Sequence, residues 1–275
     1  MSENQQQIDY WNGDAGHTWA SIQDRLDAMF APLTEQLIEA AAPRSGERII
    51  DVGCGCGETT IALADAGAEA WGVDISRPML ERAVERAGDR ANLRFTETDA
   101  STFRFAPEHD LVCSRFGVMF FSDPTSAFAN LRASLKTSGR LAFLCWRKPT
   151  DNPWMSVAGR AVQPFLPEPA EPPDPRAPGP FAFADPDYME KVLADAGFEG
   201  IDIAPIDLDL HIAPDVDSAI ALLSRVGPVA RIVQELSGTD REAAVAAAAD
   251  ALRPHVTDRG LEMGAAVWLI RATHS

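Results

Sequence analysis

One short stretch of the chain places an acidic residue ahead of three glycines at alternate positions. Asp51 closes an apolar run, Gly53, Gly55 and Gly57 follow, and a helical pattern opens at Glu58. Because glycine tolerates positive φ and has no side chain, such a turn lets a ligand lie against bare backbone. The helix that follows points its positive end at that ligand. The stretch therefore predicts the ligand-binding first loop of a doubly wound α/β domain.

Two further acids follow predicted strands. Asp74 lies at the end of the apolar run 70–75, and Asp99 follows the third apolar run. An acid at the tip of the second strand can accept both hydroxyls of a ribose. The spacing Gly-x-Gly-x-Gly is one residue shorter than the Gly-x-Gly-x-x-Gly of dinucleotide sites, which disfavours a nicotinamide dinucleotide. The structural alternative is that these aspartates only cap turns or helices.

The elements that would position these residues alternate along the chain. Apolar runs indicate strands at 48–52, 70–75, 110–116, 140–146, 201–212 and 263–272, and a further strand with its exit loop at 93–100. Helical patterns fall between the first of them, at 59–66, 76–84 and 128–135. Such alternation predicts a parallel sheet. The expected fold class is α/β, a doubly wound seven-stranded mostly parallel sheet with the last strand antiparallel, an N-terminal helical segment and a helical cap insertion.

Changes in composition divide the chain. We expect an aromatic and helical lid at 1–46, a ligand-binding core at 47–148, a proline-rich crossing segment at 149–184, and the end of the core sheet at 185–275. Residues 1–7 are polar and are expected to fray, the aromatic residues that follow lie among turn formers, and a helix is expected at 21–42. Asp185 is expected to cap a helix that ends at Gly197.

The alanine-rich insertion 215–253 has a helical pattern. We expect it to be a cap that supplies substrate contacts, with a peripheral decoration or a dimer surface as the alternative. The expected contact residues are Leu222, Leu223, Val226, Gly227 and Val229.

Composition narrows the class of protein. The net charge of −17 disfavours wrapping a nucleic-acid backbone and favours a small-molecule substrate. No apolar run is long enough to span a membrane and no leader pattern is present, so we expect a cytoplasmic protein. The four cysteines look like small buried residues, and Cys54 and Cys56 have no second Cys/His pair, so no metal site is expected. A homodimer stays open.

The order of these motifs resembles the class I S-adenosylmethionine-dependent methyltransferases, whose first motif is acidic-x-Gly-x-Gly-x-Gly. The chain is similar to the small-molecule branch related to the ubiquinone/menaquinone-biosynthesis C-methyltransferases. The resemblance covers residues 8–150 well and the rest loosely. The segments that carry it are 51–57, Asp74, Asp99 with Ala100, 114–124, 141–147 and 152–154.

The resemblance implies S-adenosyl-L-methionine as the cofactor and assigns residues to it. Asp51, Gly53, Cys54 and Gly55 would border the methionine moiety and the ribose. Asp74 would bind the ribose hydroxyls, and Asp99 with the Ala100 amide would face the adenine. The other contacts that it implies are Ile75 and Met79 against the adenine, and Ser114, Arg115 and Phe116 between cofactor and substrate. Apart from the resemblance, Tyr10 and Trp19 belong to an aromatic cluster that either covers the core or closes over the cofactor, whose positive sulfur suits aromatic faces.

The sequence gives only weak indications of catalytic residues. Methyl transfer needs alignment and exclusion of water, and it needs a base only if the acceptor loses a proton early. The weak candidates are His17, in the aromatic segment, and Arg115. His211 lies at the sixth strand, and His109 is expected to be a surface turn residue.

Other functions stay open. A nicotinamide-dependent dehydrogenase is disfavoured by the glycine spacing and by the lack of a Tyr-x-x-x-Lys pair. A catalytically silent S-adenosylmethionine-binding protein is a second alternative. An RNA or protein methyltransferase is a third, disfavoured by the acidity and by Ser114-Arg115-Phe116-Gly117 standing where an Asn-Pro-Pro-Tyr-type motif would be.

Overall fold

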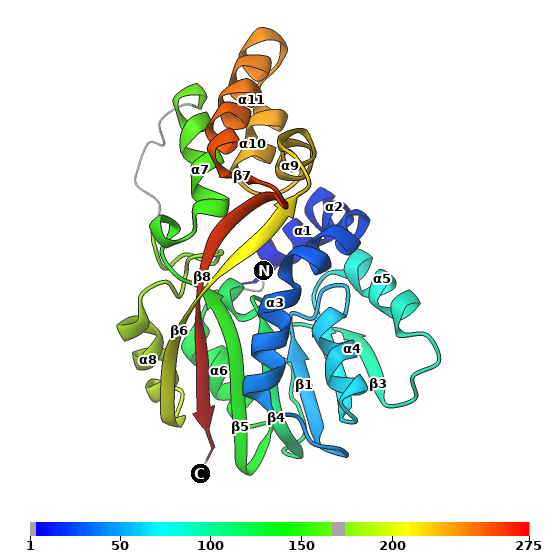
Figure 1. Cartoon of the computed structure of the whole chain (residues 1–275). Helices are drawn as coiled ribbons and strands as arrows, with labels where there is room; N and C mark the ends of the chain where they lie inside the picture. The colour runs from blue at the N-terminus through cyan, green and yellow to red at the C-terminus, as the bar shows by residue number, and fades with distance from the viewer. Residues whose placement is uncertain (1–3, 167–173, 275) are drawn as a thin grey trace. The chain divides into compact units, whose positions relative to one another are not determined.

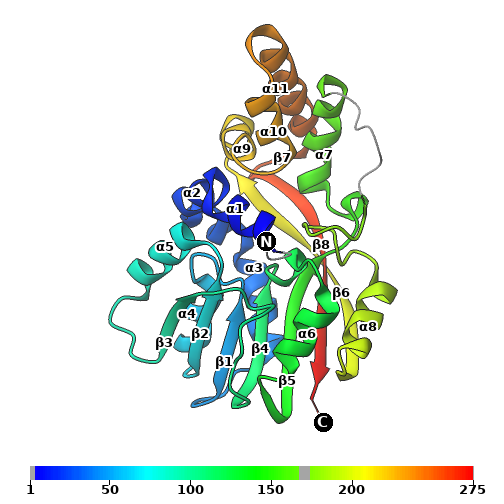
Figure 2. The same cartoon turned by 180° about the vertical axis from the view of Figure 1, so that it is seen from behind.

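The computed structural model describes residues 4–166 and 174–274 (Figures 1 and 2). The chain divides into two compact units. The first consists of Met1–Trp146, Pro175–Ile206 and Val267–Ser275, and the second of Arg147–Asp174 and Asp207–Ala266. Strands β6 (Glu199–Ala213) and β8 (Gly260–Thr273) contribute residues to both units.

One sheet carries the first unit, in the order β3-β2-β1-β4-β5-β8-β6. Parallel pairing joins the first five, and β5 pairs with β8 antiparallel. The short β7 (Val256–Thr257) pairs with β8 outside this path. The predicted doubly wound sheet with an antiparallel last strand is therefore confirmed. The remaining strands are β1 (Arg48–Val52), β2 (Glu69–Asp74), β3 (Leu93–Glu97), β4 (His109–Arg115) and β5 (Leu135–Trp146).

Helices cover both faces of this sheet. Helices α3 (Gln23–Ala41) and α4 (Glu58–Asp65) lie in front of it in Figure 1, and α6 (Pro124–Arg132) and α8 (Pro186–Asp195) lie in front of it in Figure 2. Helix α5 (Arg77–Ala87) joins β2 to β3. As expected, the Asp185 carboxylate caps α8, accepting from the Asp187 amide. Large side chains from both layers are fully buried, among them Leu33, Leu37, Ile49, Ile50, Leu111, Phe128 and Phe143.

One predicted boundary is wrong. The helix expected at 128–135 begins at Pro124 and ends at Arg132, and its cap is Asp123, whose carboxylate accepts from the Ser126 amide. Leu135 instead starts β5, and Gly139 lies inside that strand. The sequence pattern misled because Leu131 and Leu135 are spaced as on one helix face, although they are buried from two different elements.

The N-terminal segment is more helical than expected. Helices α1 (Gln5–Asn12) and α2 (Asp14–Ser21) occupy the stretch that was expected to fray and then to turn. Gly13, with extended backbone, separates them. Residues 1–3 lie outside the described residues. The predicted helix at 21–42 is present as α3, with Ala42 in the left-handed region after it.

The second unit is mainly helical. Helix α7 (Pro153–Val162) packs against α10 (Pro228–Glu235) and α11 (Gly238–Leu252), and α9 (Val216–Leu223) packs against α11. The helical character predicted for 215–253 is confirmed. Of the residues expected to contact substrate there, Leu222, Leu223, Val226 and Val229 are buried. That they and Gly227 contact the substrate stays a prediction.

The proline-rich segment is less extended than predicted. Gln163–Phe165 form a short 3-10 helix, and residues 175–184 form turns that bury Phe183. Residues 167–173 lie outside the described part of the chain. The other 3-10 helices are Val118–Phe120, Pro149–Asp151 and Arg253–His255. Within 4–166 and 174–274 no helix combines the length and the apolar character needed to cross a membrane.

Candidate active site

The glycine turn after β1 has the geometry that the sequence predicted. Gly53, Gly55 and Gly57 have φ of +65°, +53° and +84°, a region that disfavours residues with a Cβ. A Cβ on Gly55 would lie 2.8 Å from the Met79 methyl carbon. A Cβ on Gly53 would lie 2.5 Å from the Cα of Gly117. The turns after β1 and β4 therefore touch through bare backbone, and Gly117 is a site residue that the sequence reasoning missed.

The Asp74 carboxylate joins two loops. One oxygen accepts from the Gly55 amide at 2.7 Å and the other from the Ser76 amide at 2.8 Å. Burial raises the pKa of Asp74, although these backbone hydrogen bonds oppose the shift. The acid expected to bind the ribose thus lies against the glycine turn, and Ile75 follows it half-buried. Each oxygen accepts one of these amide hydrogen bonds, and a carboxylate oxygen has a second lone pair for another donor.

Asp51 is a buried carboxylate with an open acceptor. Its Oδ2 accepts from the Thr60 hydroxyl at 2.6 Å, while Oδ1 is buried with no hydrogen-bond partner among the residues that the structure describes. Burial raises the pKa of Asp51 to about 7, with the Thr60 hydrogen bond and the Arg115 charge opposing the shift. An unpaired buried acceptor is costly. The arrangement suits a cationic ligand group, such as the ammonium of a methionine moiety.

Two backbone amides of the glycine turn form hydrogen bonds within the protein. The amides of Gly53 and Cys54 both donate to the Val73 carbonyl, at 2.9 and 3.2 Å. All four cysteines are free and buried, as predicted. Burial raises the pKa of the Cys54 thiol well above its ordinary value and that of Cys56 to about 12, so neither is a thiolate.

Asp99 and Ala100 follow β3. Asp99 Oδ1 accepts from the amide and hydroxyl of Ser101, at 2.9 and 2.6 Å, and Oδ2 accepts from the Asn4 side chain at 3.0 Å. The buried Ala100 offers its carbonyl to Asn130 at 2.9 Å. Both residues lie at the same sheet edge as Asp74, because β2 and β3 are parallel neighbours. Their contact with an adenine stays a prediction.

The three residues expected between cofactor and substrate point in different directions. Ser114 is fully buried, donates to the Val52 carbonyl at 2.8 Å and accepts from the Gly117 amide at 3.1 Å, so it joins β1 to β4. Arg115 turns toward α3 and donates to the Thr34 hydroxyl at 2.5 Å. Phe116 has φ of +69° and stacks on Trp146, with ring centroids 4.2 Å apart. A non-glycine residue in this region is strained, which is typical of functional sites.

The N-terminal aromatic residues form a cluster around Trp11. Its ring makes edge contacts with Tyr10, Trp19 and Phe120, at 5.2, 5.8 and 5.3 Å between centroids. Tyr10 is 59% exposed, so its ring is available to a ligand. Helix α2 packs against α5, and α5 directly follows the short loop after Asp74.

The histidines are not brought together. His17 is exposed on α2, and His211 is exposed on β6 in the second unit. The expectation for His109 is wrong. It starts β4 buried, its Nδ1 donates to the carbonyls of Ala106 and Ser134, and its ring packs against Trp71. Burial lowers its pKa, so this histidine is a core residue.

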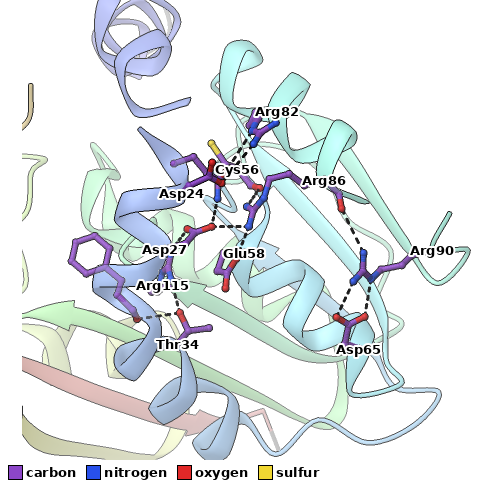
Figure 3. A network of polar contacts seen from close by, with 12 residues as sticks. Asp24, Asp27, Thr34, Cys56, Glu58, Asp65, Arg82, Arg86, Arg90 and Arg115 are labelled. Atoms are coloured by element: carbon purple, nitrogen blue, oxygen red, sulfur yellow. Dashed lines mark hydrogen bonds and ion pairs between the residues drawn. The ribbon is translucent and has the colours of Figure 1, made fainter. Parts of the chain in front are cut away.

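A network of ion pairs lies beside the glycine turn (Figure 3). The Arg86 guanidinium donates to the Cys56 carbonyl and to the carboxylates of Asp27 and Glu58, the last two at 2.6 Å. Arg115 lies 3.8 Å from Asp27 on its other side. Burial raises the pKa of Asp27 to about 6, and the neighbouring Glu58 adds to the shift. The network therefore ties α3 and α5 to the start of α4.

Replacing Arg86 should show how much this network contributes to the stability of the protein. We expect Arg86→Met to lower the free energy of unfolding at pH 8 by about 3 kcal/mol, because it leaves two partly buried carboxylates without their cation. The loss should shrink at pH 5, below the pKa of about 6 of Asp27, since a protonated Asp27 no longer repels Glu58. Urea unfolding at both pH values measures the difference.

Arg90→Met is the matched control. Arg90 lies just after the end of α5 and also pairs with a carboxylate, that of Asp65, at 2.7 Å, but this pair is exposed (Figure 3). Exposed pairs contribute little, so this variant should unfold nearly like wild type at both pH values. Equal losses in the two variants would contradict a special role for the Arg86 network.

Comparison with known proteins agrees with this site. Residues 49–139, which run from β1 into β5, match the family described as "Methyltransferase domain". Aklanonic acid methyltransferase from Streptomyces is 34% identical over 45% of this chain and 60% of its own length. The ubiquinone biosynthesis O-methyltransferase of Methylococcus capsulatus is 29% identical over 74% of this chain and 88% of its own. The chain thus spans three fifths of the first of these relatives.

Solved structures share the fold at low identity. The YcgJ protein from Bacillus subtilis aligns with a TM-score of 0.58 at 18% identity, covering 87% of this chain and 97% of that one. A Haemonchus contortus phosphoethanolamine N-methyltransferase, solved with S-adenosyl-L-methionine, gives 0.54 at 18% identity, covering 88% and 52%. Identities this low speak for the fold alone.

These findings confirm the predicted class. The core of the chain is a class I S-adenosylmethionine-dependent methyltransferase domain, with S-adenosylmethionine as its cofactor. The residues present fit that cofactor, because a glycine turn, an acid after β2 and a buried carboxylate with an open oxygen meet at the carboxyl edge of the parallel strands.

Proposed function

We propose that the whole chain is an enzyme that transfers a methyl group from S-adenosylmethionine to a small-molecule acceptor. The observation that carries this proposal is the Asp74 carboxylate, held 2.7 Å from the Gly55 amide between the glycine turn and the loop after β2. In open α/β sheets, ligands bind at the carboxyl ends of the strands where the strand order reverses. Here that point lies between β1 and β4.

The chain's own residues have distinct tasks in this proposal. When bound, S-adenosylmethionine supplies an electrophilic methyl group on a positively charged sulfur. Asp74 would hold the ribose hydroxyls, and the open oxygen of Asp51 would hold the ammonium group. Phe116 has a strained backbone, and its half-buried ring stacks on Trp146. This ring would shield the reacting atoms from water. Alignment and a dry environment are the main requirements for such a displacement.

The small-molecule class of the acceptor is supported by charge. The chain carries −17, which would repel a phosphate backbone. By their names, the two relatives described above act on aklanonic acid and in ubiquinone biosynthesis. We propose a small acceptor of this general kind.

Methyl-labelled S-adenosylmethionine tests the proposal directly. The protein is incubated with the labelled cofactor and a panel of hydroxylated aromatic acceptors, and the label is followed into the acceptor fraction. Transfer by wild type and none by Asp74→Ala is the expected result. Label in an added RNA or protein, and in no small molecule, would overturn the proposed acceptor class.

A further inference from the structure

Helix α1 ends on the loop that follows β2. The side-chain amide of Asn12, the last residue of α1, donates to the Ile75 carbonyl at 2.8 Å and accepts from the Arg77 amide at 3.0 Å. Between these two groups lies Ser76, whose hydroxyl donates to the Trp11 carbonyl at 2.7 Å. Three hydrogen bonds over more than sixty residues of sequence therefore fix this loop to α1.

The packing around these bonds is tight. A Cβ on Gly16, in α2, would lie 2.0 Å from the Trp11 carbonyl oxygen and 2.7 Å from the Ser76 hydroxyl oxygen. Ser76 is fully buried, so its hydroxyl has no water to replace a lost partner. Figure 1 shows α1 and α2, in dark blue, beside the start of α5. The loop and the two helices thus form one closely packed structure.

The loop held by Asn12 orients Asp74. The Ser76 amide donates to one carboxylate oxygen of Asp74 at 2.8 Å, and the Gly55 amide donates to the other. Because Asn12 bonds the residues on both sides of Ser76, it fixes the direction of the Ser76 amide. At the other end of α1, Asn4 donates to Asp99. One helix therefore reaches the loops after both β2 and β3.

We propose that Asn12 is a positioning residue for the ribose of the cofactor. It holds loop 75–77 so that the Asp74 carboxylate presents its free lone pairs to the ribose hydroxyls. This inference rests on the proposed function, because it concerns the same cofactor site. If Asn12 only attached α1 to the domain, its loss would lower stability without changing which ligands are preferred.

Calorimetric titration with S-adenosylhomocysteine and its 2′-deoxy analogue separates the two roles. Wild type should prefer S-adenosylhomocysteine. Asn12→Ala should raise the Kd for S-adenosylhomocysteine about tenfold, the loss expected for a misplaced charged hydrogen bond. It should raise the Kd of the analogue less, because the analogue already lacks one of the two hydroxyls. The preference for S-adenosylhomocysteine over the analogue, measured as the ratio of the two Kd values, should therefore be smaller in Asn12→Ala than in wild type. An unchanged preference would overturn the proposal.

Asn92→Ala is the matched control. The Asn92 amide also bridges two backbone groups, the carbonyls of Ala64 and Ala68 at 2.7 and 2.9 Å, but it lies just before β3, at the amino edge of the sheet. It should leave both Kd values unchanged. If Asn12→Ala does not fold, Ser76→Ala removes the hydroxyl bond to Trp11 and should narrow the preference in the same direction. Failure of wild type to bind S-adenosylhomocysteine would refute the proposed function itself, whereas normal binding by wild type and Asn12→Ala alike would refute only the role of Asn12.

Discussion

Replacing Asp74 by alanine should raise the Kd for S-adenosylhomocysteine at least about a hundredfold, to the point where titration detects no binding. The variant loses the acceptor for two ribose hydroxyls and also the acceptor for the Gly55 and Ser76 amides. Losing both disorders the glycine turn and the loop after β2 together. Asp74→Asn keeps one acceptor oxygen and should bind more tightly than Asp74→Ala, but less tightly than wild type.

Asp110→Ala controls for the loss of a carboxylate. Asp110 accepts from the Arg48 amide at 2.9 Å and from the Lys136 ammonium at 2.7 Å, near the amino end of β4. It therefore resembles Asp74 in its bonding but lies at the opposite edge of the parallel strands. Its Kd for S-adenosylhomocysteine should equal that of wild type. Unimpaired binding by Asp74→Ala would remove Asp74 from the site.

The second large effect concerns Asp51 and pH. Its pKa is about 7 in the folded chain, above the 3.8 of an ordinary aspartate, because the carboxylate is buried. Between these values the folded state holds a proton that the unfolded state has released. The stability of the protein should therefore fall as pH rises through this window, by up to about 1.4 kcal/mol per pH unit from this group.

Asp51→Asn should remove this part of the pH dependence. Urea unfolding between pH 5 and pH 8 should show a flatter profile for the variant, with its advantage over wild type largest at pH 8. Although Asp51→Asn should be more stable at high pH, it should bind S-adenosylhomocysteine more weakly, because the amide carries no negative charge to pair with the ammonium group. In wild type, the affinity for S-adenosylhomocysteine should rise from pH 6 to pH 7.5, and in Asp51→Asn it should be weak and flat. Parallel stability profiles for the two proteins would contradict the raised pKa.

Asp27 provides a check on this interpretation. Its pKa is also raised by burial, to about 6, so it contributes to the same loss of stability but at lower pH. Because both wild type and Asp51→Asn keep Asp27, its contribution cancels in the difference between their stabilities, which should still grow between pH 6 and pH 7. Asp27 pairs with Arg86 in the ion-pair network.

The parts of the site that are local in sequence were predictable. The alternate glycines after an apolar run fix a tight turn, and an acid after the second strand falls at the same edge because parallel strands share it. Asp51, Gly53, Gly55 and Asp74 lie where this reasoning placed them. The order of strands and helices predicted the sheet for the same reason.

The parts that depend on distant contacts were not predictable. Asn12 meets Ile75 and Arg77 across more than sixty residues, and Arg86 meets Asp27 across a similar separation. Nothing in the local pattern of either residue signals its partner. His109 was expected at the surface because it lies just before the fourth strand, at the edge of the sheet away from the site, but the aromatic rings of Trp71 and Phe105 pack against it. Gly117 had a local signal, a glycine directly after the fourth strand.

Titration of the wild-type protein with S-adenosylhomocysteine tests the central claim most directly. The site described above predicts a single class of binding sites with a Kd on the order of a micromolar. The same protein should show no binding of NADH, because the glycine turn is one residue shorter than a dinucleotide turn. Absence of S-adenosylhomocysteine binding, above all together with binding of NADH, would contradict the assignment of this site to S-adenosylmethionine.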